Sequence, residues 1–316
     1  MFIIINPKSG NGKTEKRWKN IIQPLLDSKD FKYEFEITEY QNHATEIARE
    51  RVKAGEDYIV AVGGDGTFNE VVNGFFENNE LINPDVILGL VSSGTGSDTI
   101  KTLGHSKEFE DAVDILKNGI DKKVDIGLAR YKNFEGEPES RYFINVGDVG
   151  LGGDVVDRVN KTTKIFGGKV SFLIGAIRGI LHHKKVNSKI IIGEKEDQEY
   201  ECDLNLVAVG IGQYFGGGMW ICPNAINDDG LFDIVTIQDA GRWKLLTNIG
   251  KIYDGKHLEM PEAKEHPRAK RVKVEAQEPL FLDLDGEQVG TTDVEFTIIP
   301  QAVLIKTIKE NQTNID

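Results

Sequence analysis

The first 124 residues alternate short apolar runs with longer segments in which apolar residues recur every three or four positions. Short apolar runs are typical of β-strands, and the recurrence is typical of amphipathic helices. The pattern predicts strands at 2–6, 33–38, 58–62 and 86–91, and helices near 13–26, 44–54 and 69–77. Strands that alternate with helices indicate a doubly wound α/β domain, which we assign to residues 1–124.

From Asp125 onward strand-like runs dominate and only two helical patterns remain. Strands are predicted at 189–192, 204–210, 232–237, 271–276 and 281–284, and helices at 169–181 and 242–253. Many strands separated by turns favour a β-sandwich-like domain, which we assign to residues 125–298. The apolar runs at 296–299 and 302–308 leave two possibilities open for residues 299–316: they end the second domain, or they cross back to complete the first.

The motif Gly63-Gly64-Asp65-Gly66-Thr67 stands between the apolar run 58–62 and a helical pattern. Glycines let the backbone approach a phosphate closely, and the N–H groups of a first helical turn attract an anion. A carboxylate at Asp65 would repel bound phosphates unless a divalent cation lay between them. The motif therefore predicts a phosphate site with a metal ion, and the alternative is a glycine-rich turn with an exposed aspartate.

The composition is that of a core-forming chain, since 39% of its 316 residues are hydrophobic and 34 are glycine. Cys202 and Cys222 lack the spacing of a disulfide framework or metal site, so we expect two small buried residues in a reducing compartment. The longest apolar segment, 170–181, contains Arg178 and is too short to span a bilayer. These features predict a cytoplasmic protein of about two domains.

A net charge of −13 argues against general nucleic-acid binding, but the charge is unevenly distributed. Residues 158–189 contain no acidic side chain, and they surround an apolar run with basic ones. The basic residues of this segment are Arg158, Lys161, Lys164, Lys169, Arg178, Lys184, Lys185 and Lys189. This basic segment predicts peripheral contact with an anionic membrane surface, or else a core helix whose exposed face is basic.

Two other motifs fail on the chemistry of their positions. Gly12-Lys13-Thr14 resembles the end of a P-loop, but the register places Pro7 at the first glycine, and proline has no N–H for a phosphate. Asp283-Leu284-Asp285-Gly286 resembles part of an EF-hand, but its first and twelfth ligand positions would be Phe281 and Thr292. We assign neither a P-loop nor an EF-hand.

Five motifs together resemble the diacylglycerol kinase catalytic-domain family, and in particular its soluble bacterial lipid kinases. They occur in the family's order along essentially the whole chain: Asn6-Pro7-Lys8-Ser9-Gly10, Gly63-Gly64-Asp65-Gly66-Thr67, Gly94-Thr95-Gly96-Ser97-Asp98, Asn227-Asp228-Asp229-Gly230-Leu231-Phe232-Asp233 and Asp285-Gly286-Glu287. The third motif departs from the family pattern P-x-G-T-x-N-D, because Ser92 replaces the proline and Ser97 replaces the asparagine. The turn and its polar contacts are therefore expected to differ.

The resemblance implies a fold and a nucleotide site. It implies an N-terminal domain like that of NAD kinases, a β-sandwich-like C-terminal domain and an active site in the cleft between them. Asp65 and Asp98 would orient the Mg²⁺ that bridges the β- and γ-phosphates of ATP. The residues that would hold ATP are Asn6, Pro7, Lys8, Ser9, Gly10, Thr38, Gly64, Asp65, Gly66, Thr67, Phe68, Asn69, Glu70 and Thr95.

The resemblance also assigns two sites in the C-terminal half. Glu287 matches the family's general base, which accepts the proton of a lipid hydroxyl as the γ-phosphoryl group transfers. The alternative is that residues 285–287 are a hairpin turn with exposed carboxylates. A second, structural Mg²⁺ would be held by a carboxylate of Asp229 and main-chain oxygens of Ile226 and Leu231. The alternative there is an Asx-type turn.

The sequence thus predicts an ATP- and Mg²⁺-dependent lipid kinase that contacts the membrane peripherally and binds no nucleic acid. The simplest acceptor is diacylglycerol, which would give phosphatidic acid. A NAD kinase, which shares the GGDGT motif, is one alternative. A non-catalytic nucleotide- or lipid-binding regulatory module is another, and a homodimer is compatible with each.

Overall fold

The computed structural model describes residues 1–155, 168–193 and 197–309, with the side chains of 168–174 omitted. Arg158, Lys161, Lys164 and the Lys169 side chain of the basic segment lie outside the described residues. The chain forms two compact units. The N-terminal unit is Met1–Val124 with the chain from Ala302, and the C-terminal unit is Asp125–Gln301.

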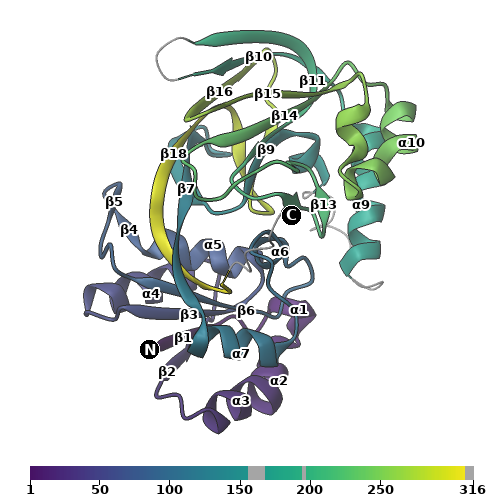
Figure 1. The fold of residues 1–316 in the computed structure, drawn as a ribbon. Helices are drawn as coiled ribbons and strands as arrows, with labels where there is room; N and C mark the ends of the chain where they lie inside the picture. The colour runs from purple at the N-terminus through teal and green to yellow at the C-terminus, as the bar shows by residue number, and fades with distance from the viewer. Residues whose placement is uncertain (156–167, 194–196, 310–316) are drawn as a thin grey trace, which may run out of the picture. The chain divides into compact units, whose positions relative to one another are not determined.

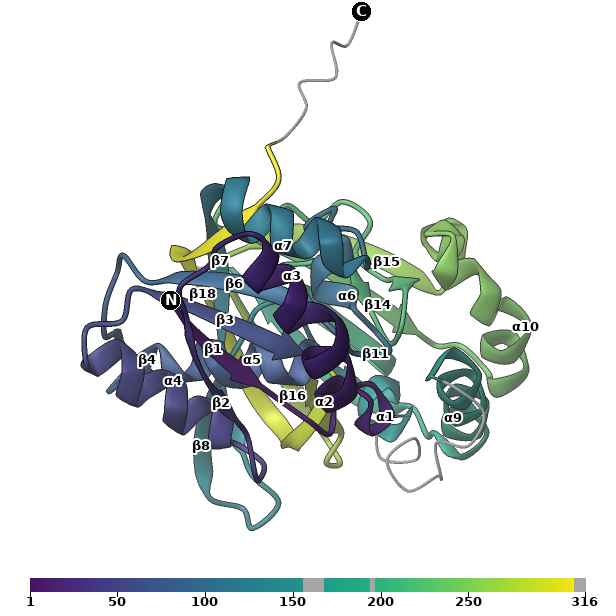
Figure 2. The ribbon, with the colours of Figure 1, turned by 90° about the horizontal axis from the view of Figure 1, so that it is seen from below.

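A parallel sheet forms the centre of the N-terminal unit, with strand order β18-β6-β3-β1-β2 (Figure 2). Its strands are β1 (Phe2–Ile5), β2 (Glu34–Ile37), β3 (Tyr58–Gly63), β6 (Ile87–Ser92) and the end of β18 (Glu287–Thr307). A short hairpin, β4 (Phe76–Glu77) and β5 (Glu80–Leu81), stands apart from it. The predicted run 302–308 thus belongs to a longer strand, in which Leu304 and Ile305 pair with Ile87 and Leu88 of β6.

Helices cover both faces of this sheet (Figures 1 and 2). They are α1 (Ser9–Gly12), α2 (Thr14–Arg17), a π-helical turn (Trp18–Ile22), α3 (Gln23–Ser28), α4 (His43–Lys53), α5 (Asp65–Gly74), α6 (Asp98–Thr102) and α7 (Phe109–Asn118). Ile3 and Ile5 of β1 pack with Trp18, Ile22 and Leu26 in one apolar cluster, because alternate side chains of a strand point to one face.

The helix predicted at 69–77 begins earlier and ends earlier, at Asp65 and Gly74. Gly64 has an extended backbone and is the residue before the helix, so the turn after β3 consists of Gly64 alone. The first residues of the helix are Asp65, Gly66 and Thr67. None of them is a large apolar residue, so the hydrophobic pattern does not show where the helix begins. As a result, the GGDGT motif provides both the end of the strand and the first turn of the helix.

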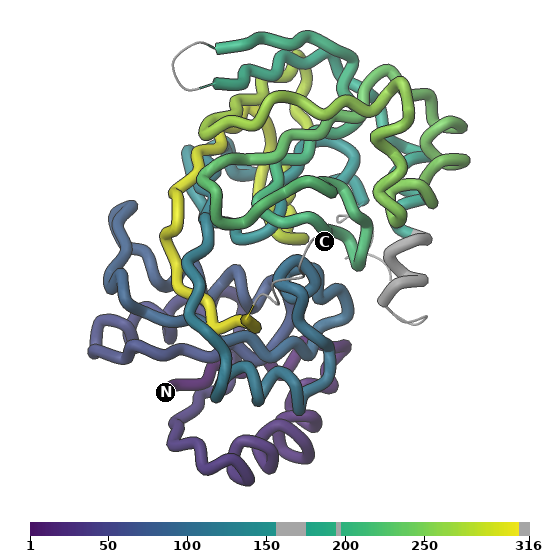
Figure 3. The backbone as a smooth tube through the Cα atoms, in the orientation of Figure 1, coloured from purple at the N-terminus to yellow at the C-terminus, as the bar shows by residue number. Residues whose placement is uncertain are grey.

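The C-terminal unit is built of mostly antiparallel strands. They are β7 (Ile120–Lys132), β8 (Pro138–Phe143), β9 (Val146–Gly150), β10 (Val186–Ile192), β11 (Gln198–Gly210), β12 (Tyr214–Phe215), β13 (Met219–Trp220), β14 (Phe232–Gln238), β15 (Ala263–Ala269), β16 (Arg271–Ala276), β17 (Phe281–Leu284) and the first part of β18. Figure 3 shows the chain entering this unit through β7 and leaving it through β18.

Strand β11 organises the C-terminal unit, because its two halves have different neighbours. Its first half pairs with β10, and its second half pairs with β9 on one edge and β14 on the other. Val207 and Val209 face the larger apolar core, whereas Leu206 and Ala208 face a second cluster. The second cluster holds residues of α9 (Gly168–His182) and α10 (Arg242–Tyr253), which lie beside one another in Figure 1. A 3₁₀ turn (Lys256–Glu259) follows α10.

These observations confirm the predicted fold class, a doubly wound α/β unit followed by a β-sandwich-like unit. Among the described residues no helix is long and apolar enough to cross a membrane.

Candidate functional site

Three loops meet at one edge of the N-terminal sheet, where the parallel strands β1, β3 and β6 end. The Asn6 amide Nδ2 donates a hydrogen bond to Thr67 Oγ1 at 3.0 Å, which joins the first loop to the second. The Gly64 N–H donates to Ser9 Oγ at 3.2 Å, and the Ser93 N–H donates to the Gly63 carbonyl at 2.7 Å. The carboxyl edge of a parallel sheet is where α/β proteins bind ligands.

Gly64 and Gly94 bring two of these loops into backbone contact. A Cβ atom added at Gly94 would lie 2.6 Å from the Gly64 Cα, a distance that real Cβ atoms do not show. Only glycine therefore fits at position 94 without moving the loop. The glycine at position 94 therefore serves the close packing of the two loops.

Asp65 links the GGDGT loop to the loop after β6. Its Oδ2 accepts a hydrogen bond from the Ser97 N–H at 2.8 Å, and its Oδ1 accepts one from the Thr99 N–H at 2.9 Å. Asp98 is also buried. Its carboxylate lies near that of Asp65, since a Cβ added at Gly96 would lie 3.0 Å from Asp65 Oδ2 and 3.4 Å from Asp98 Oδ2. Carboxylate oxygens can accept several contacts each, and Mg²⁺ prefers such ligands, so this pair fits a cation.

The first turn of α5 provides the anion-binding part of the site. Gly64 gives the helix no side-chain cap, so the N–H groups of Asp65, Gly66 and Thr67 have no acceptor within the helix. Such groups, with the positive end of the helix dipole, bind phosphate. The structure thus places the glycine motif as predicted, on a strand, a turn and a helix start.

The remaining residues predicted to hold ATP divide into two groups. Pro7, Lys8, Gly10 and Thr95 lie on the loops and are partly or fully exposed. Phe68, Asn69, Glu70 and Thr38 are buried.

The buried members of the second group stabilise the unit. Phe68 is fully buried, and Glu70 Oε2 accepts a hydrogen bond from the Ala44 N–H at the start of α4. The Thr38 N–H donates to the Ile5 carbonyl at 2.8 Å. The side chains of Phe68 and Glu70 are therefore held by the fold, and their place in nucleotide binding stays a prediction.

Arg17 is a site residue that the sequence analysis missed. Its guanidinium donates hydrogen bonds to the Ser93 carbonyl at 2.8 Å and to Ser93 Oγ at 3.0 Å, which brings a cation to the loop after β6. Thr14 Oγ1 also donates to Ser93 Oγ, at 2.8 Å. Arg17 lies in a helix after the first loop and belongs to no sequence motif, so only the structure shows its contact with Ser93.

The two departures from the family pattern contact each other. Ser92 Oγ and Ser97 Oγ lie 2.8 Å apart in a buried hydrogen bond. Ser97 has a left-handed backbone with φ of 62°, a conformation that asparagine tolerates better than most residues. The serine pair thus closes the turn by a side-chain contact of its own.

In the C-terminal unit, Asp285 and Gly286 form the two-residue turn between β17 and β18. Both have positive φ, 52° and 86°, and Leu284 pairs with Glu287 across the turn. The hairpin is therefore real, but its carboxylates are not free in solvent as the alternative required. Asp285 accepts hydrogen bonds from the N–H groups of Ile144, Asn145 and Val146, and Glu287 Oε2 is 2.7 Å from Arg141 Nη2.

An apolar cavity of about 240 Å³ lies within the same unit. It is lined mainly by side chains of α9, α10, β9 and β11 and their neighbours, including Ala176, Ile180, Leu206, Leu245 and Ile249. Asp148 of β9, Asp283 of β17 and Gly286 also line it. Sequence reasoning missed Asp148 entirely and met Asp283 only within a rejected EF-hand motif.

Burial raises the pKa of both cavity carboxyls. It raises the pKa of Asp283 to about 7, a hydrogen bond from the Gly286 backbone opposes the shift, and the nearby Asp285 and Glu287 add to it. Burial also raises the pKa of Asp148 well above its usual range, with a further contribution from the charge of Asp283. At neutral pH the pair therefore retains at least one proton for much of the time.

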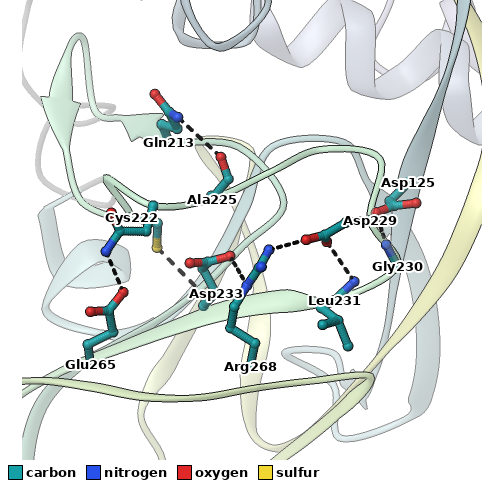
Figure 4. Close-up of polar contacts among 11 residues, drawn as sticks. Asp125, Gln213, Cys222, Ala225, Asp229, Gly230, Leu231, Asp233, Glu265 and Arg268 are labelled. Atoms are coloured by element: carbon teal, nitrogen blue, oxygen red, sulfur yellow. Dashed lines mark hydrogen bonds and ion pairs between the residues drawn. The ribbon is translucent and has the colours of Figure 1, made fainter. Parts of the chain in front are cut away.

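Figure 4 shows the loop for which a structural Mg²⁺ was predicted. Asp229 Oδ1 accepts a hydrogen bond from the Leu231 N–H at 3.1 Å, which is the geometry of the Asx-type turn. Its Oδ2 is paired with Arg268, whose Nε also bonds Asp233 at 2.9 Å. Ile226 is exposed. A cation here would have to share Asp229 with Arg268, and the metal assignment stays a prediction.

The described part of the basic segment is less positive than its sequence indicates. Lys185 Nζ lies 2.9 Å from Asp203, and Lys189 Nζ lies 2.6 Å from Glu199, so strand β11 and the residues beside it supply the missing acids. Lys184 is exposed. The apolar side chains Ile177, Leu181 and Trp243 are exposed on α9 and α10, and Trp243 is 79% exposed.

Comparison with known proteins places both halves of the chain. Residues 1–129 match a family model described as the diacylglycerol kinase catalytic domain, and residues 146–307 match one described as the YegS C-terminal NAD kinase beta sandwich-like domain. The diacylglycerol kinase of Staphylococcus carnosus (strain TM300) is 27% identical over 98% of this chain and 95% of its own. The diacylglycerol kinase of Bacillus subtilis (strain 168) is 26% identical over 99% of this chain and 98% of its own.

Solved structures agree with these matches. One from Bacillus anthracis str. Sterne has a TM-score of 0.75 and 27% identity, and covers 97% of this chain and 96% of its own. A second from the same organism, described as a diacylglycerol kinase, has a TM-score of 0.70 at 24% identity with the same coverage, and supports the fold alone.

Replacing Gly94 by Ala tests the contact between the two loops. The added Cβ would lie 2.6 Å from the Gly64 Cα, so we expect the variant to lose roughly 1–3 kcal/mol of unfolding free energy. Urea denaturation measures this. Gly241→Ala is the matched control, because that glycine has φ of −77° and no atom near its Cβ position. Equal stability of the two variants would contradict the contact.

Replacing Asp283 by Asn tests the buried acid. The folded protein holds a proton at Asp283 up to about pH 7, whereas the unfolded chain releases it near the usual value of 3.8. Stability from this group is thus present at low pH and is lost as pH rises toward 7. We expect Asp283→Asn to gain stability relative to the wild type between pH 5 and 8, as measured by urea denaturation. An exposed-site control, Asp30→Asn, should show no such trend.

Proposed function

Because the chain belongs to the diacylglycerol kinase catalytic-domain family and carries the YegS-type C-terminal domain, we propose that it is a lipid kinase. It transfers the γ-phosphoryl group of ATP to a lipid hydroxyl, most simply that of diacylglycerol, which gives phosphatidic acid. Relatives named diacylglycerol kinase, at 26–28% identity, support this class of acceptor.

The observation that carries the proposal is the loop cluster of the N-terminal unit. The first turn of α5, the Ser9–Gly10 loop and the loop after β6 surround one sheet edge with backbone N–H groups and the Arg17 guanidinium. This arrangement suits the phosphates of ATP, since phosphoryl transfer depends on positioning and on neutralising charge. Asp65 and Asp98 would hold Mg²⁺, which offsets the charge that develops between the β- and γ-phosphates.

Glu287 is the proposed general base. A lipid hydroxyl is a poor nucleophile, so a carboxylate accepts its proton while the hydroxyl oxygen bonds to the γ-phosphorus and the bond to the β–γ bridging oxygen breaks. ADP leaves with that oxygen. The ion pair with Arg141 and the tight turn at Asp285 and Gly286 hold Glu287 in one place.

The apolar cavity favours a lipid acceptor over the alternative acceptor, NAD. Apart from Asp148 and Asp283 its walls are mostly apolar, and such a surface binds an alkyl chain rather than a charged dinucleotide. Helices α9 and α10, which supply much of that wall, also carry the exposed Ile177, Leu181 and Trp243. We place peripheral membrane contact on this surface, with Lys184 toward anionic head groups.

The test of the function is transfer of labelled phosphate from MgATP to a total lipid extract in detergent micelles, with NAD as a parallel acceptor. We expect one labelled lipid and no labelled NADP. In the same assay Glu287→Gln should lower turnover by about 10² or more while ATP binding is retained. Label in NADP would replace the lipid kinase by a NAD kinase, and unchanged turnover of the variant would remove Glu287 as the base.

The membrane surface has its own test, sedimentation with anionic vesicles. Trp243→Ala should weaken binding roughly tenfold, because the side chain loses its apolar transfer into the interface. Lys184→Glu should also weaken vesicle binding, and the loss should be larger at low salt than at high salt. Phe134→Ala is the matched control, since Phe134 is an aromatic residue of the β7–β8 turn that is 56% exposed. Equal losses for Trp243→Ala and Phe134→Ala would contradict this surface.

A further inference from the structure

Asp148 and Asp283 are directly opposite each other on neighbouring antiparallel strands. The register of β9 and β17 pairs them, and residues paired in this way have Cα atoms about 4.5–5.5 Å apart. Both side chains are almost completely buried, at 1% and 3% exposure, and both line the apolar cavity. Like charges in opposed positions destabilise a sheet, so this is a costly place for two acids.

Each carboxyl group presents one oxygen that the fold does not use. Within the described residues, Asp148 Oδ1 and Asp283 Oδ2 are buried without a hydrogen-bond partner. The other oxygen of Asp283 accepts the Gly286 N–H at 2.8 Å. Asp285, two residues away, differs, since it binds three backbone N–H groups. The structural carboxylate of this hairpin is Asp285, whereas Asp283 lines the cavity and has a buried oxygen without a hydrogen-bond partner among the described residues.

Glycines make room for the pair. A Cβ atom added at Gly152 would lie 1.9 Å from Asp148 Oδ1, so no other residue fits there without displacing the carboxyl group. The loop after β9 thus packs backbone directly against Asp148. Around the pair, the remaining wall of the cavity is apolar, with Leu206, Ile180 and Ile249 among its residues. A ligand that satisfies two acceptors and fills an aliphatic space is an amphiphile.

We propose that Asp148 and Asp283 anchor the polar head of an amphiphilic ligand whose alkyl chain fills the apolar cavity. The head is one that donates hydrogen bonds, from hydroxyl or ammonium groups, and heads that carry a carboxylate or phosphate are rejected. This inference rests on the proposed function in so far as the ligand is the lipid acceptor. The pair is a specificity site and does not take part in the chemical step.

The chemistry of the pair determines this choice of head. Carboxyl oxygens accept hydrogen bonds, and once one proton has left, the pair carries a negative charge that repels an anionic head. The groups that face Asp283 are Asp148 from β9, Asp285 and Glu287 from the hairpin, and Arg141 from β8. Acids outnumber the single arginine among them. An ammonium head would therefore bind more tightly as pH rises through 7, whereas a neutral hydroxylated head would not.

The anchor is also close in the chain to the proposed base. Asp283 holds the Gly286 N–H, and Gly286 precedes Glu287. A head bound to the pair would thus be held beside the turn that carries Glu287. The pair would select which hydroxylated lipids reach the base, independently of how the nucleotide binds.

The test uses ligands with one alkyl chain and different heads, namely 1-oleoylglycerol, oleylamine and oleate. Binding to the full chain without ATP is measured by equilibrium dialysis, so a failure of kinase activity does not affect the result. At pH 8, above the pKa of about 7 for Asp283, we expect wild-type protein to bind 1-oleoylglycerol or oleylamine at least tenfold more tightly than oleate. A rise in oleylamine affinity from pH 6 to 8, with 1-oleoylglycerol unchanged, would support a negative charge on the pair, and its absence would overturn the rejection of anionic heads.

Variants of the pair complete the test. Asp148→Leu with Asp283→Leu should lower 1-oleoylglycerol binding at least tenfold, and Asp148→Asn with Asp283→Asn should raise oleate binding because the charge is removed. Asp203→Asn is the control, since that carboxylate is exposed and pairs with Lys185. Unchanged selectivity between 1-oleoylglycerol and oleate in these variants would overturn the proposal. If a variant fails to fold, the wild-type protein still tests the proposal. Equal affinity of the wild-type protein for all three ligands would overturn it.

Discussion

Backbone contact between Gly64 and Gly94 is the constraint on which the loop cluster of the N-terminal unit depends. It holds the loops after β3 and β6 at a separation that no side chain could share. Once that distance is set, Asp65 can accept the Ser97 and Thr99 N–H groups, and the first turn of α5 faces the same edge as the Ser9 loop. The carboxylate that looked anomalous among phosphate-binding groups is therefore also a structural link between two loops. The metal-binding role that we propose for it is compatible with this link, because each carboxylate oxygen can accept more than one contact.

Much of the fold could be predicted from the sequence, because burial imposes a period on it. The runs at 2–6, 58–62 and 271–276 correspond to β1, β3 and β16, and the helix predicted at 242–253 coincides with α10. The start of α5 could not be predicted from hydrophobicity, since its first turn is polar and glycine-rich. Long-range pairing is also absent from any local pattern, and so Lys185 and Lys189 looked unpaired until β11 supplied Asp203 and Glu199.

The candidate site divides along similar lines. Residues in contiguous motifs, such as 63–67 and 285–287, were found because several chemical requirements fall within a few positions. Arg17, Asp148 and Arg141 were missed, because each reaches its partner from a distant strand or helix. Phe68 follows directly after a motif and its side chain is fully buried, so its place at the nucleotide site stays a prediction.

Strand β18 has a consequence for how the protein is made. Within the part of the chain that the structure describes, the edge of β6 opposite β3 pairs with Leu304 and Ile305 of β18. During synthesis from the N-terminus, the first 124 residues emerge long before that strand exists. An uncovered strand edge is a template for pairing with other chains. The nascent N-terminal unit therefore exposes one sheet edge until the second part of β18 has been synthesised, and a chain cut before Ala302 would keep that edge exposed.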